Sequence, residues 1–262
     1  MSGYPIGDTP LTWQAPPRGG ALRGILIIVP AFLWAFGYIV FLILALLLAP
    51  GWSRRHRLKL LRTWGKGLLW MFGIRMELHG LEHRDRSGAK ILAVNHVSLV
   101  DLFVYSAAWA DPGTVIYKKE FGRIPLMGRV MRMLGFIEVD RGNSEAARLS
   151  VAHAAQRIRE EGLSMWIAPE GTRSRLGGLQ KFKMGAFHMA QQTKAPLVPT
   201  IMRGADLVNP MGSWIVRSGT IRVDFLPPID TGNWSRRELR EKSTEVRELF
   251  LRFLPEAPDS AS

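Results

Sequence analysis

Two side chains with the chemistry of a general base, His96 and Asp101, lie five residues apart in this sequence. They follow the apolar run Ile91–Val94, which is typical of a strand that ends in a turn. On a continuous helix they would point about 140° apart, but a turn at His96 would bring the carboxylate to one ring nitrogen. The other nitrogen could then accept a proton from a hydroxyl. The alternative is a pair of turn residues that only form hydrogen bonds.

A second polar turn, Pro169–Ser174, also follows an apolar run. Gly171 allows a ligand to approach the backbone closely, and Thr172 and Arg173 supply hydrogen-bond donors for phosphate oxygens. The same residues are typical of a polar turn capped by its threonine. Two lysines follow in the segment Lys181–Lys183, for which a solvated charge pair is the simplest interpretation.

Basic residues also lie at two further strand ends. Lys118 follows the apolar run Thr114–Tyr117, and Arg141 follows Phe136–Val139. Arg141 could bind a phosphate or pair with a neighbouring carboxylate. Open α/β sheets bind ligands outside the carboxyl ends of their strands. In a parallel sheet these basic residues would therefore surround the histidine–aspartate pair.

Beyond residue 75, apolar strand-like runs alternate with amphipathic segments of helical spacing. The predicted strands are Arg75–His79, Ile91–Val94, Thr114–Tyr117, Phe136–Val139, Ser164–Ile167, Leu197–Ile201 and Ile221–Phe225. The predicted helices are Leu99–Trp109, Leu126–Leu134, Ser144–Glu161, Lys183–Gln192 and Ser235–Phe253, the last beginning with a capping box of Ser235 and Glu238. This alternation predicts a single α/β domain with a largely parallel central sheet flanked by helices.

The N-terminal part of the chain predicts a membrane helix. Residues 24–53 contain no charged side chain, and the apolar run Ile25–Ala49 would form a helix about 37 Å long, enough to cross a hydrocarbon core of roughly 30 Å. A buried core helix is one alternative. Pro30 and Gly37 also allow a bent helix that enters one leaflet only.

A basic segment follows this run directly. Its basic residues are Arg54, Arg55, Arg57, Lys59, Arg62 and Lys66. By the positive-inside rule, this excess predicts a cytoplasmic location for the body of the protein. Apolar residues at helical spacing on the opposite face predict a basic amphipathic helix in the headgroup region, with a helix packed on the domain as the alternative. Gly51 would allow the two helices to form a hairpin.

Composition limits the classes of function. The 262 residues carry a formal net charge of +13, which favours an anionic partner such as a membrane, a nucleic acid or an acidic carrier. The chain has no cysteine, which excludes a disulfide scaffold, a thiol nucleophile and a cysteine-ligated zinc site. Its six histidines show no HExxH or comparable spacing, so no metal is expected.

Four motifs, in order and approximate spacing, resemble those of the glycerolipid acyltransferase superfamily, and most closely the bacterial 1-acyl-glycerol-3-phosphate acyltransferases. They lie between about residues 75 and 225 and are Asn95–His96 with Asp101, Gly135–Arg141, Pro169–Ser174 and Ala195–Pro199. The connecting segments at Lys118, Ile124–Pro125 and Lys181–Lys183 also fit. Glu138 departs from the pattern, because relatives usually carry an apolar residue there, and this leaves the surroundings of Arg141 and the acceptor headgroup open.

The resemblance implies an acyltransferase in which His96 deprotonates the free hydroxyl of a lysophospholipid as that oxygen attacks an acyl thioester. Asp101 would orient the imidazole and stabilise its cation. With 1-acyl-glycerol-3-phosphate as the acceptor, the product would be phosphatidic acid. The implied phosphate site, whose loop Glu170 orders, consists of Lys118, Arg141, Glu170, Gly171, Thr172 and Arg173.

The resemblance implies no bound cofactor. The co-substrate would be acyl-CoA or acyl-[acyl carrier protein], and the partners would be membrane lipids, the lysophospholipid acceptor and the thioester donor, with no nucleic acid. We expect an inner-membrane protein with its catalytic domain on the cytoplasmic side. The expected parts are a mobile tail at 1–23, membrane-anchoring helices at 24–73, the acyltransferase domain at 74–254 and a C-terminal tail at 255–262.

Two alternatives stay open at this point. The same chemistry could act on another lysolipid, such as a lyso-ornithine lipid, because such enzymes share these motifs. In a different class, the chain could be a non-catalytic, membrane-anchored protein that binds anionic lipid or acyl carrier protein through its basic surface. Thioester consumption would separate the enzyme from the binding protein.

Overall fold

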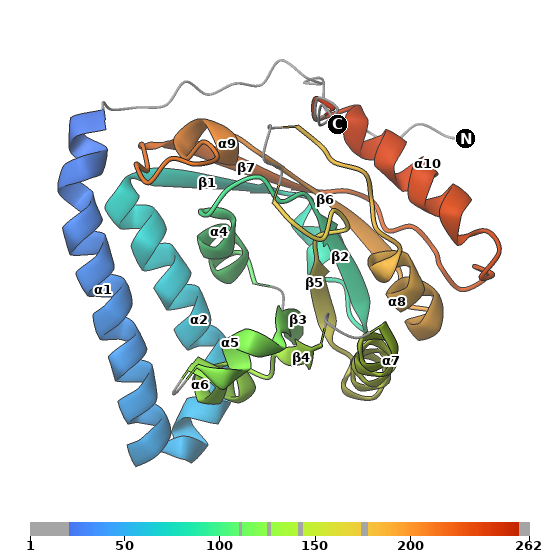
Figure 1. Ribbon diagram of the computed structural model, residues 1–262, viewed down its shortest axis with the longest axis horizontal. Helices are drawn as coiled ribbons and strands as arrows, with labels where there is room; N and C mark the ends of the chain where they lie inside the picture. The colour runs from blue at the N-terminus through green and yellow to red at the C-terminus, as the bar shows by residue number, and fades with distance from the viewer. Residues whose placement is uncertain (1–20, 110–111, 125–126, 141–143, 174–177, 257–262) are drawn as a thin grey trace.

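The computed structural model describes residues 21–109, 112–124, 127–140, 144–173 and 178–256. Within these ranges the chain forms an N-terminal helical hairpin followed by one α/β domain (Figure 1). The strands are β1 (Ile74–His79), β2 (Lys90–Val94), β3 (Gly113–Lys118), β4 (Ile137–Val139), β5 (Ser164–Ile167), β6 (Leu197–Arg203) and β7 (Gly219–Phe225). All seven predicted strands are present, so the predicted fold class is confirmed.

Helices cover both faces of this sheet (Figure 1). They are α1 (Ala21–Leu48), α2 (Pro50–Phe72), α3 (Leu81–Arg84), α4 (Asp101–Ala107), α5 (Lys119–Arg123), α6 (Met127–Met133), α7 (Ser144–Glu161), α8 (Gly185–Thr193), α9 (Ala205–Val208) and α10 (Leu239–Leu251). The short helices α3, α5 and α9 were not predicted, because segments of four or five residues show no helical period.

The strands form one sheet in the order β1-β7-β6-β2-β5-β3-β4. Every neighbouring pair is parallel except β6 and β7, which are antiparallel. Strands β2, β3, β4, β5 and β6 therefore run in one direction, and their carboxyl ends lie along one edge. The prediction that basic residues at the strand ends surround the histidine–aspartate pair depends on this parallel arrangement.

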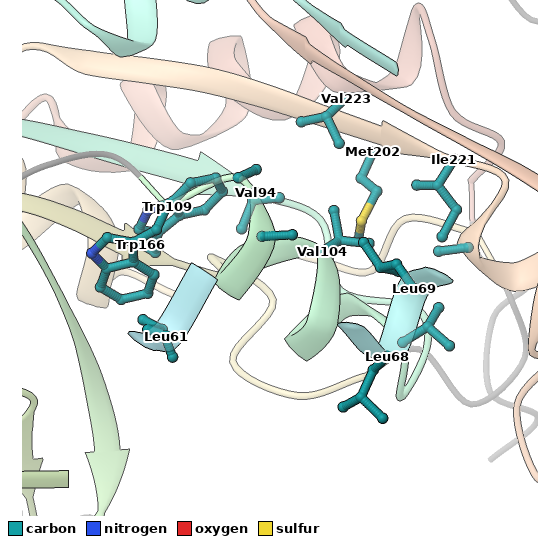
Figure 2. Packing of buried hydrophobic residues seen from close by; sticks show 14 of the residues in the cluster. Leu61, Leu68, Leu69, Val94, Val104, Trp109, Trp166, Met202, Ile221 and Val223 are labelled. Carbon is teal, nitrogen blue, oxygen red and sulfur yellow. The ribbon is translucent and has the colours of Figure 1, made fainter. Parts of the chain in front are cut away.

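The two faces of β2 belong to two different hydrophobic clusters. Leu92 and Val94 pack with side chains of α2, α4 and β7, as Figure 2 shows for part of that cluster. Ile91 and Ala93 point to the other face, into the cluster formed with α7, α8 and α10. A strand that is buried on both faces reads as an unbroken apolar run, which is why β2 was recognisable in the sequence.

Helices α1 and α2 form the predicted hairpin and lie side by side at the left of Figure 1. The chain leaves helical geometry at Ala49, and Pro50 begins α2, where its missing N–H costs nothing. Helix α2 ends at Gly73 in the left-handed conformation, with φ of 67°. Arg23 donates a hydrogen bond from Nη1 to the carbonyl of Phe72 at 2.8 Å, which ties the start of α1 to the end of α2.

Helix α1 is exposed along most of its length, whereas α2 packs against the domain. Leu26 and Val29 are more than half exposed, while Leu68 and Leu69 of α2 are buried. In the part of the chain that the structure describes, one helix, Leu22–Leu48, is long and apolar enough to cross a membrane. Its role as a membrane helix stays a prediction.

Three helices begin at least two residues later than predicted. Helix α4 starts at Asp101 rather than Leu99, and α8 starts at Gly185 rather than Lys183, whose N–H is bonded to a loop carbonyl. Helix α10 starts at Leu239. The expected capping contacts exist, because Ser235 donates its backbone N–H and its hydroxyl to Glu238 at 3.0 and 2.6 Å, but they close a turn ahead of the helix.

Candidate active site

The residue before the histidine is fixed by the neighbouring strand. Asn95 is fully buried and pairs with Met202 of β6 as a strand residue would: its amide donates to the Met202 carbonyl at 2.8 Å, and its Oδ1 accepts the Met202 N–H at 2.7 Å. The Tyr105 hydroxyl donates to the Asn95 carbonyl at 2.9 Å. The turn that carries His96 therefore starts from a rigid position at the carboxyl end of β2.

The predicted turn brings the histidine and the aspartate together. His96 Nδ1 lies 2.7 Å from Asp101 Oδ2. The same oxygen accepts the backbone N–H groups of Val97 at 2.8 Å and Ser98 at 2.9 Å, so one carboxylate oxygen organises the whole turn. These contacts also explain why α4 starts at Asp101, since residues 97–100 form the turn around its carboxylate.

The pair combines a buried acid with an accessible base. The Asp101 side chain is fully buried, and that of His96 is 29% exposed. His96 Nε2 has no hydrogen-bond partner among the residues that the structure describes. This nitrogen can therefore meet a substrate hydroxyl, as the general-base interpretation requires.

Burial raises the pKa of the Asp101 carboxyl, and the hydrogen bonds from His96, Ser98 and Val97 oppose that rise. Burial also raises the pKa of the Tyr105 hydroxyl well above its ordinary value, with smaller contributions from Asp101 and Glu170. Tyr105 is thus a neutral hydrogen-bond donor. Two buried carboxyl groups, Asp101 at the ring and Glu170 at the backbone N–H, therefore hold His96 in place.

Glu170 connects the second polar turn to the first. It is 1% exposed; its Oε1 accepts the backbone N–H of His96 at 2.8 Å, and its Oε2 accepts that of Gln180 at 3.0 Å. Burial raises the pKa of Glu170, and the backbone hydrogen bonds from Gln180 and His96 oppose that rise. Both oxygens bind the protein itself, a geometry that fits the expected role of Glu170 in ordering the loop.

Gly171 is covered by a lysine. Its φ is 71°, and a Cβ added there would lie 2.8 Å from Cδ and 3.1 Å from Nζ of Lys183. The backbone N–H of Lys183 donates to the Pro169 carbonyl at 2.7 Å, which holds the two segments together. Sequence reasoning treated Lys183 as a solvated charge. The structure instead places its ammonium beside the turn, a contact that no local pattern could distinguish from that of Lys181.

The cations of this turn have no acidic partner among the residues that the structure describes. Arg173 is partly exposed and Lys183 is exposed, and neither forms an ion pair with any residue inside the described ranges. Thr172 is exposed as well. The turn that carries them is joined to the backbone of His96 through Glu170, and such side chains can bind an anion.

Two further residues, Lys118 and Arg141, were predicted to bind the phosphate. The structure describes only the backbone of Lys118 and does not describe Arg141. Lys118 is the last residue of β3, which pairs in parallel with β5, so its backbone lies on the same sheet edge as the 169–173 turn. Its side chain and the whole of Arg141 lie outside the described residues. Arg141 follows β4, whose carboxyl end lies on that edge.

Glu138, the departure from the expected motif, has a local role. Its Oε2 accepts a hydrogen bond from the Tyr117 hydroxyl at 3.0 Å. The same oxygen lies 2.3 Å from the place that a Cβ on Gly122 would occupy, so a larger residue there would displace the Glu138 carboxylate. The acidic side chain thus serves the packing of α5 on the end of β3.

Sequence reasoning missed the residues that support the catalytic turn from outside it. Ser98 donates its hydroxyl to the backbone carbonyl of Asn209 at 2.9 Å and lies 3.1 Å from its Oδ1. Asn209 is 2% exposed and lies 111 residues away in sequence. No pattern within a local window signals such a pair. No group of three or more histidines and acids that could hold a metal occurs in the part of the chain that is described.

Comparison with known proteins agrees with this geometry. Residues 75–203 match the family model described as acyltransferase. A curated 1-acyl-sn-glycerol-3-phosphate acyltransferase from Limnanthes douglasii is 37% identical over 190 residues, which are 72% of this chain and 66% of that protein. The chain belongs to the acyltransferase family.

Bacterial members of the acyltransferase family are also similar. The 1-acyl-sn-glycerol-3-phosphate acyltransferase of Escherichia coli is 29% identical over 180 residues, 69% of this chain and 73% of that protein. The crystal structure of the 1-acyl-sn-glycerophosphate acyltransferase from Thermotoga maritima has the same fold, with a TM-score of 0.73 and 24% identity over 88% of this chain and 96% of that one. The resemblance inferred from the four motifs is thereby confirmed. The roles of the individual site residues stay predictions.

Proposed function

We propose that this protein transfers an acyl chain from an acyl thioester to the free hydroxyl of 1-acyl-glycerol-3-phosphate, which gives phosphatidic acid. The observation that carries this proposal is the His96–Asp101 contact at 2.7 Å, which leaves Nε2 accessible; Glu170 joins this turn to the one that carries Arg173. The names of the plant and bacterial relatives support the same reaction and the same acceptor.

The imidazole acts as the general base. His96 Nε2 accepts the proton of the acceptor hydroxyl while that oxygen attacks the thioester carbonyl. When the tetrahedral intermediate collapses, the carbon–sulfur bond breaks, and the thiolate takes the proton from the imidazolium. No acyl-enzyme is needed, and the chain has no cysteine to form a thiol-linked one. General-base catalysis of this kind contributes about 10²- to 10⁴-fold.

Asp101 supports the base in two ways. Its hydrogen bond to Nδ1 holds the tautomer that leaves Nε2 free to accept a proton, and its charge stabilises the imidazolium. The backbone N–H groups of Val97 and Ser98 keep this carboxylate in place. The ring therefore meets the acceptor in a fixed orientation.

The acceptor phosphate binds to the open side of the site. Arg173, Thr172 and the backbone at Gly171 supply donors there, and Lys183 adds an ammonium group over the same turn. Lys118 and Arg141 extend this site from the neighbouring strand ends. Charge-assisted hydrogen bonds to phosphate are about twice as strong as neutral ones. Glu170 holds the turn in position by accepting the backbone N–H groups of His96 and Gln180.

The donor is an acyl-CoA or an acyl-[acyl carrier protein], and the enzyme carries no bound cofactor. The net charge of +13 suits both donors, because each presents phosphates or acidic side chains. The protein binds lipid through α1, whose apolar side chains are exposed, while the basic helix α2 links it to the domain. The proposed location of the catalytic domain is the cytoplasmic face of the inner membrane, which the positive-inside rule supports because the basic residues of α2 directly follow α1.

Acceptor competition tests this proposal. The purified protein would be given one labelled acyl thioester together with lysophosphatidic acid, lyso-ornithine lipid and lysophosphatidylcholine. We expect phosphatidic acid to be the dominant labelled product. Labelling of another lysolipid alone would keep the reaction and overturn the acceptor. Failure to consume either thioester donor would favour the binding protein instead of the enzyme.

A further inference from the structure

In the loop between α9 and β7, residues 209–217 expose a large apolar side chain near the N-terminal end of α1. Trp214 is 84% exposed, and Met211 in the same loop is 39% exposed. A single exposed apolar residue needs no explanation. This one, however, directly precedes Ile215, which lies against α1 at Gly24.

The contact between the loop and α1 is close. A Cβ added at Gly24 would lie 2.5 Å from Cγ2 of Ile215 and 2.8 Å from the carbonyl of Val216, so only glycine allows this approach. Figure 1 shows the segment between α9 and β7 beside the N-terminal end of α1. At the same level of the helix, on the face opposite Gly24, Leu22 is 70% exposed and Leu26 is 66% exposed.

The position of the contact along α1 fits the boundary between lipid and water. Arg23 is the last charged residue before the uncharged run that begins at Gly24. The loop therefore meets the helix where its apolar part starts, which is where tryptophan is enriched in membrane proteins. Arg217 at the end of the loop is exposed, and it has no acidic partner in the described part of the chain. An indole next to an unpaired cation suits an anionic lipid surface.

One buried side chain links this loop to the active site. The amide group of Asn209 donates to the carbonyl of Ser213 at 2.9 Å and to that of Ile215 at 3.3 Å, on either side of Trp214. Asn209 also accepts the hydrogen bond from Ser98, two residues from His96. The position of the exposed tryptophan is thus fixed relative to the catalytic turn.

We propose that the 209–217 loop is a second membrane contact, in which Trp214 inserts into the lipid interface and orients the His96 site towards the bilayer. The inference rests on the membrane location in the proposed function and adds to it: α1 anchors the protein by entering one leaflet only, with both ends at the cytoplasmic interface, and the loop sets its orientation. The ligand is the lipid surface, with Arg217 at the headgroups. The lysolipid acceptor then reaches His96 from the membrane side.

The absence of cysteine from the chain makes a direct test possible. Trp214→Cys, Leu26→Cys on α1 and Leu149→Cys on α7 would each be labelled with an environment-sensitive fluorophore. The proteins would be reconstituted into vesicles of phosphatidylethanolamine and phosphatidylglycerol that contain a lipid with a spin label near the top of its acyl chain. Leu149 is a matched control, because it is 58% exposed on the far side of the sheet.

We expect the spin label to quench the probes at 214 and 26 but not the probe at 149. Quenching at 26 alone would overturn the inference and leave the membrane anchor intact. Quenching at neither 214 nor 26 would overturn the anchor, and the inference with it. Activity on detergent-solubilised acceptor would still be present in both cases if the proposed reaction is right.

A kinetic test separates orientation from folding. In Trp214→Ala we expect a several-fold lower kcat/KM for lysolipid presented in vesicles, and an unchanged value for a short-chain, monomeric acceptor in water. Leu149→Ala should change neither value. Equal losses of Trp214→Ala on both acceptors would contradict the role in membrane orientation, as would full activity on vesicles.

Discussion

The carboxylates and the cations of the candidate site are held in different ways. Asp101 and Glu170 are almost fully buried. Asp101 accepts two backbone N–H groups from the turn after β2, and Glu170 accepts one from that turn and one from Gln180. Arg173 and Lys183 lie nearer the surface and pair with no described carboxylate. The fold therefore positions the anionic half, whereas the cationic half is left for a ligand to neutralise. Substitutions in the first half should reduce turnover or stability, and those in the second should weaken acceptor binding.

The largest effect is expected for Asp101→Asn. An amide in place of the carboxylate removes the charge that stabilises the imidazolium and favours the wrong tautomer of His96. We expect kcat to fall by about 10²- to 10⁴-fold, with little change in KM. Steady-state kinetics with both substrates varied would measure this, and Asp206→Asn, an exposed change on α9, serves as the matched control. A rise in KM with an unchanged kcat would show that Asp101 binds substrate instead of supporting the base.

Arg173→Ala should act on binding. Loss of a charge-assisted hydrogen bond of about 1.5–3 kcal/mol corresponds to a rise in KM of about 10- to 100-fold for a phosphate-bearing acceptor. The rise should be absent for an acceptor without phosphate. The comparison uses Arg237→Ala, an exposed arginine ahead of α10, which should leave both KM values unchanged. An equal loss on both acceptors would contradict the phosphate role.

Glu170→Gln tests whether the buried carboxylate of Glu170 stabilises the fold. Glutamine can accept only one of the two backbone N–H groups, so its amide group faces a buried donor, at a cost of about 1–3 kcal/mol in the free energy of unfolding. Denaturant unfolding in detergent would measure this loss, with the exposed Glu241→Gln as the control. An unchanged stability would show that the link between the two turns is unimportant.

The same variant predicts a pH dependence. Because burial raises the pKa of Glu170, the native state binds its proton more tightly than the unfolded chain does. The stability contributed by this group is present below its ordinary pKa of 4.5 and is lost as the pH rises through the raised native value. The difference in unfolding free energy between the wild type and Glu170→Gln should therefore become smaller as the pH rises from about 4.5 through the raised native pKa. A difference that grows with rising pH would contradict a raised pKa of Glu170 in the native state.

Lys183→Met should have the smallest effect. Methionine keeps an aliphatic chain over Gly171 and removes only the ammonium group. We expect a several-fold rise in KM for the phosphate-bearing acceptor and an unchanged kcat. Lys181→Met is the matched control two residues away. If both variants behave alike, the effect comes from general surface charge, and Lys183 has no specific place in the site.

The elements of the fold could be predicted where burial leaves a simple pattern. Strand β2 is buried on both faces and is an apolar run, and α7 was predicted with its observed ends, Ser144–Glu161. Helix starts were less accurate, because tertiary contacts decide them. Asp101 gathers the N–H groups of the preceding turn, and the N–H of Lys183 goes to Pro169.

The catalytic pair could be predicted from the sequence, but the distant residues that hold its turn in place could not. His96 and Asp101 are close in sequence, so a turn was enough to join them. Asn95 binds Met202 across 107 residues, and Ser98 binds Asn209 across 111. A local sequence pattern carries no information on such pairs, which depend on how β6 and α9 come to lie beside the turn. The position of Lys183 over Gly171 depends in the same way on the path of the chain between them.

The most direct test of the central claim is single-turnover acyl transfer to lysophosphatidic acid by purified His96→Ala, with His153→Ala on α7 as the control. Circular dichroism would confirm that both variants are folded. We predict that His96→Ala loses about 10²- to 10⁴-fold in rate, while His153→Ala retains the rate of the unmodified protein. Near-normal transfer by folded His96→Ala would remove the histidine from the mechanism and contradict this account.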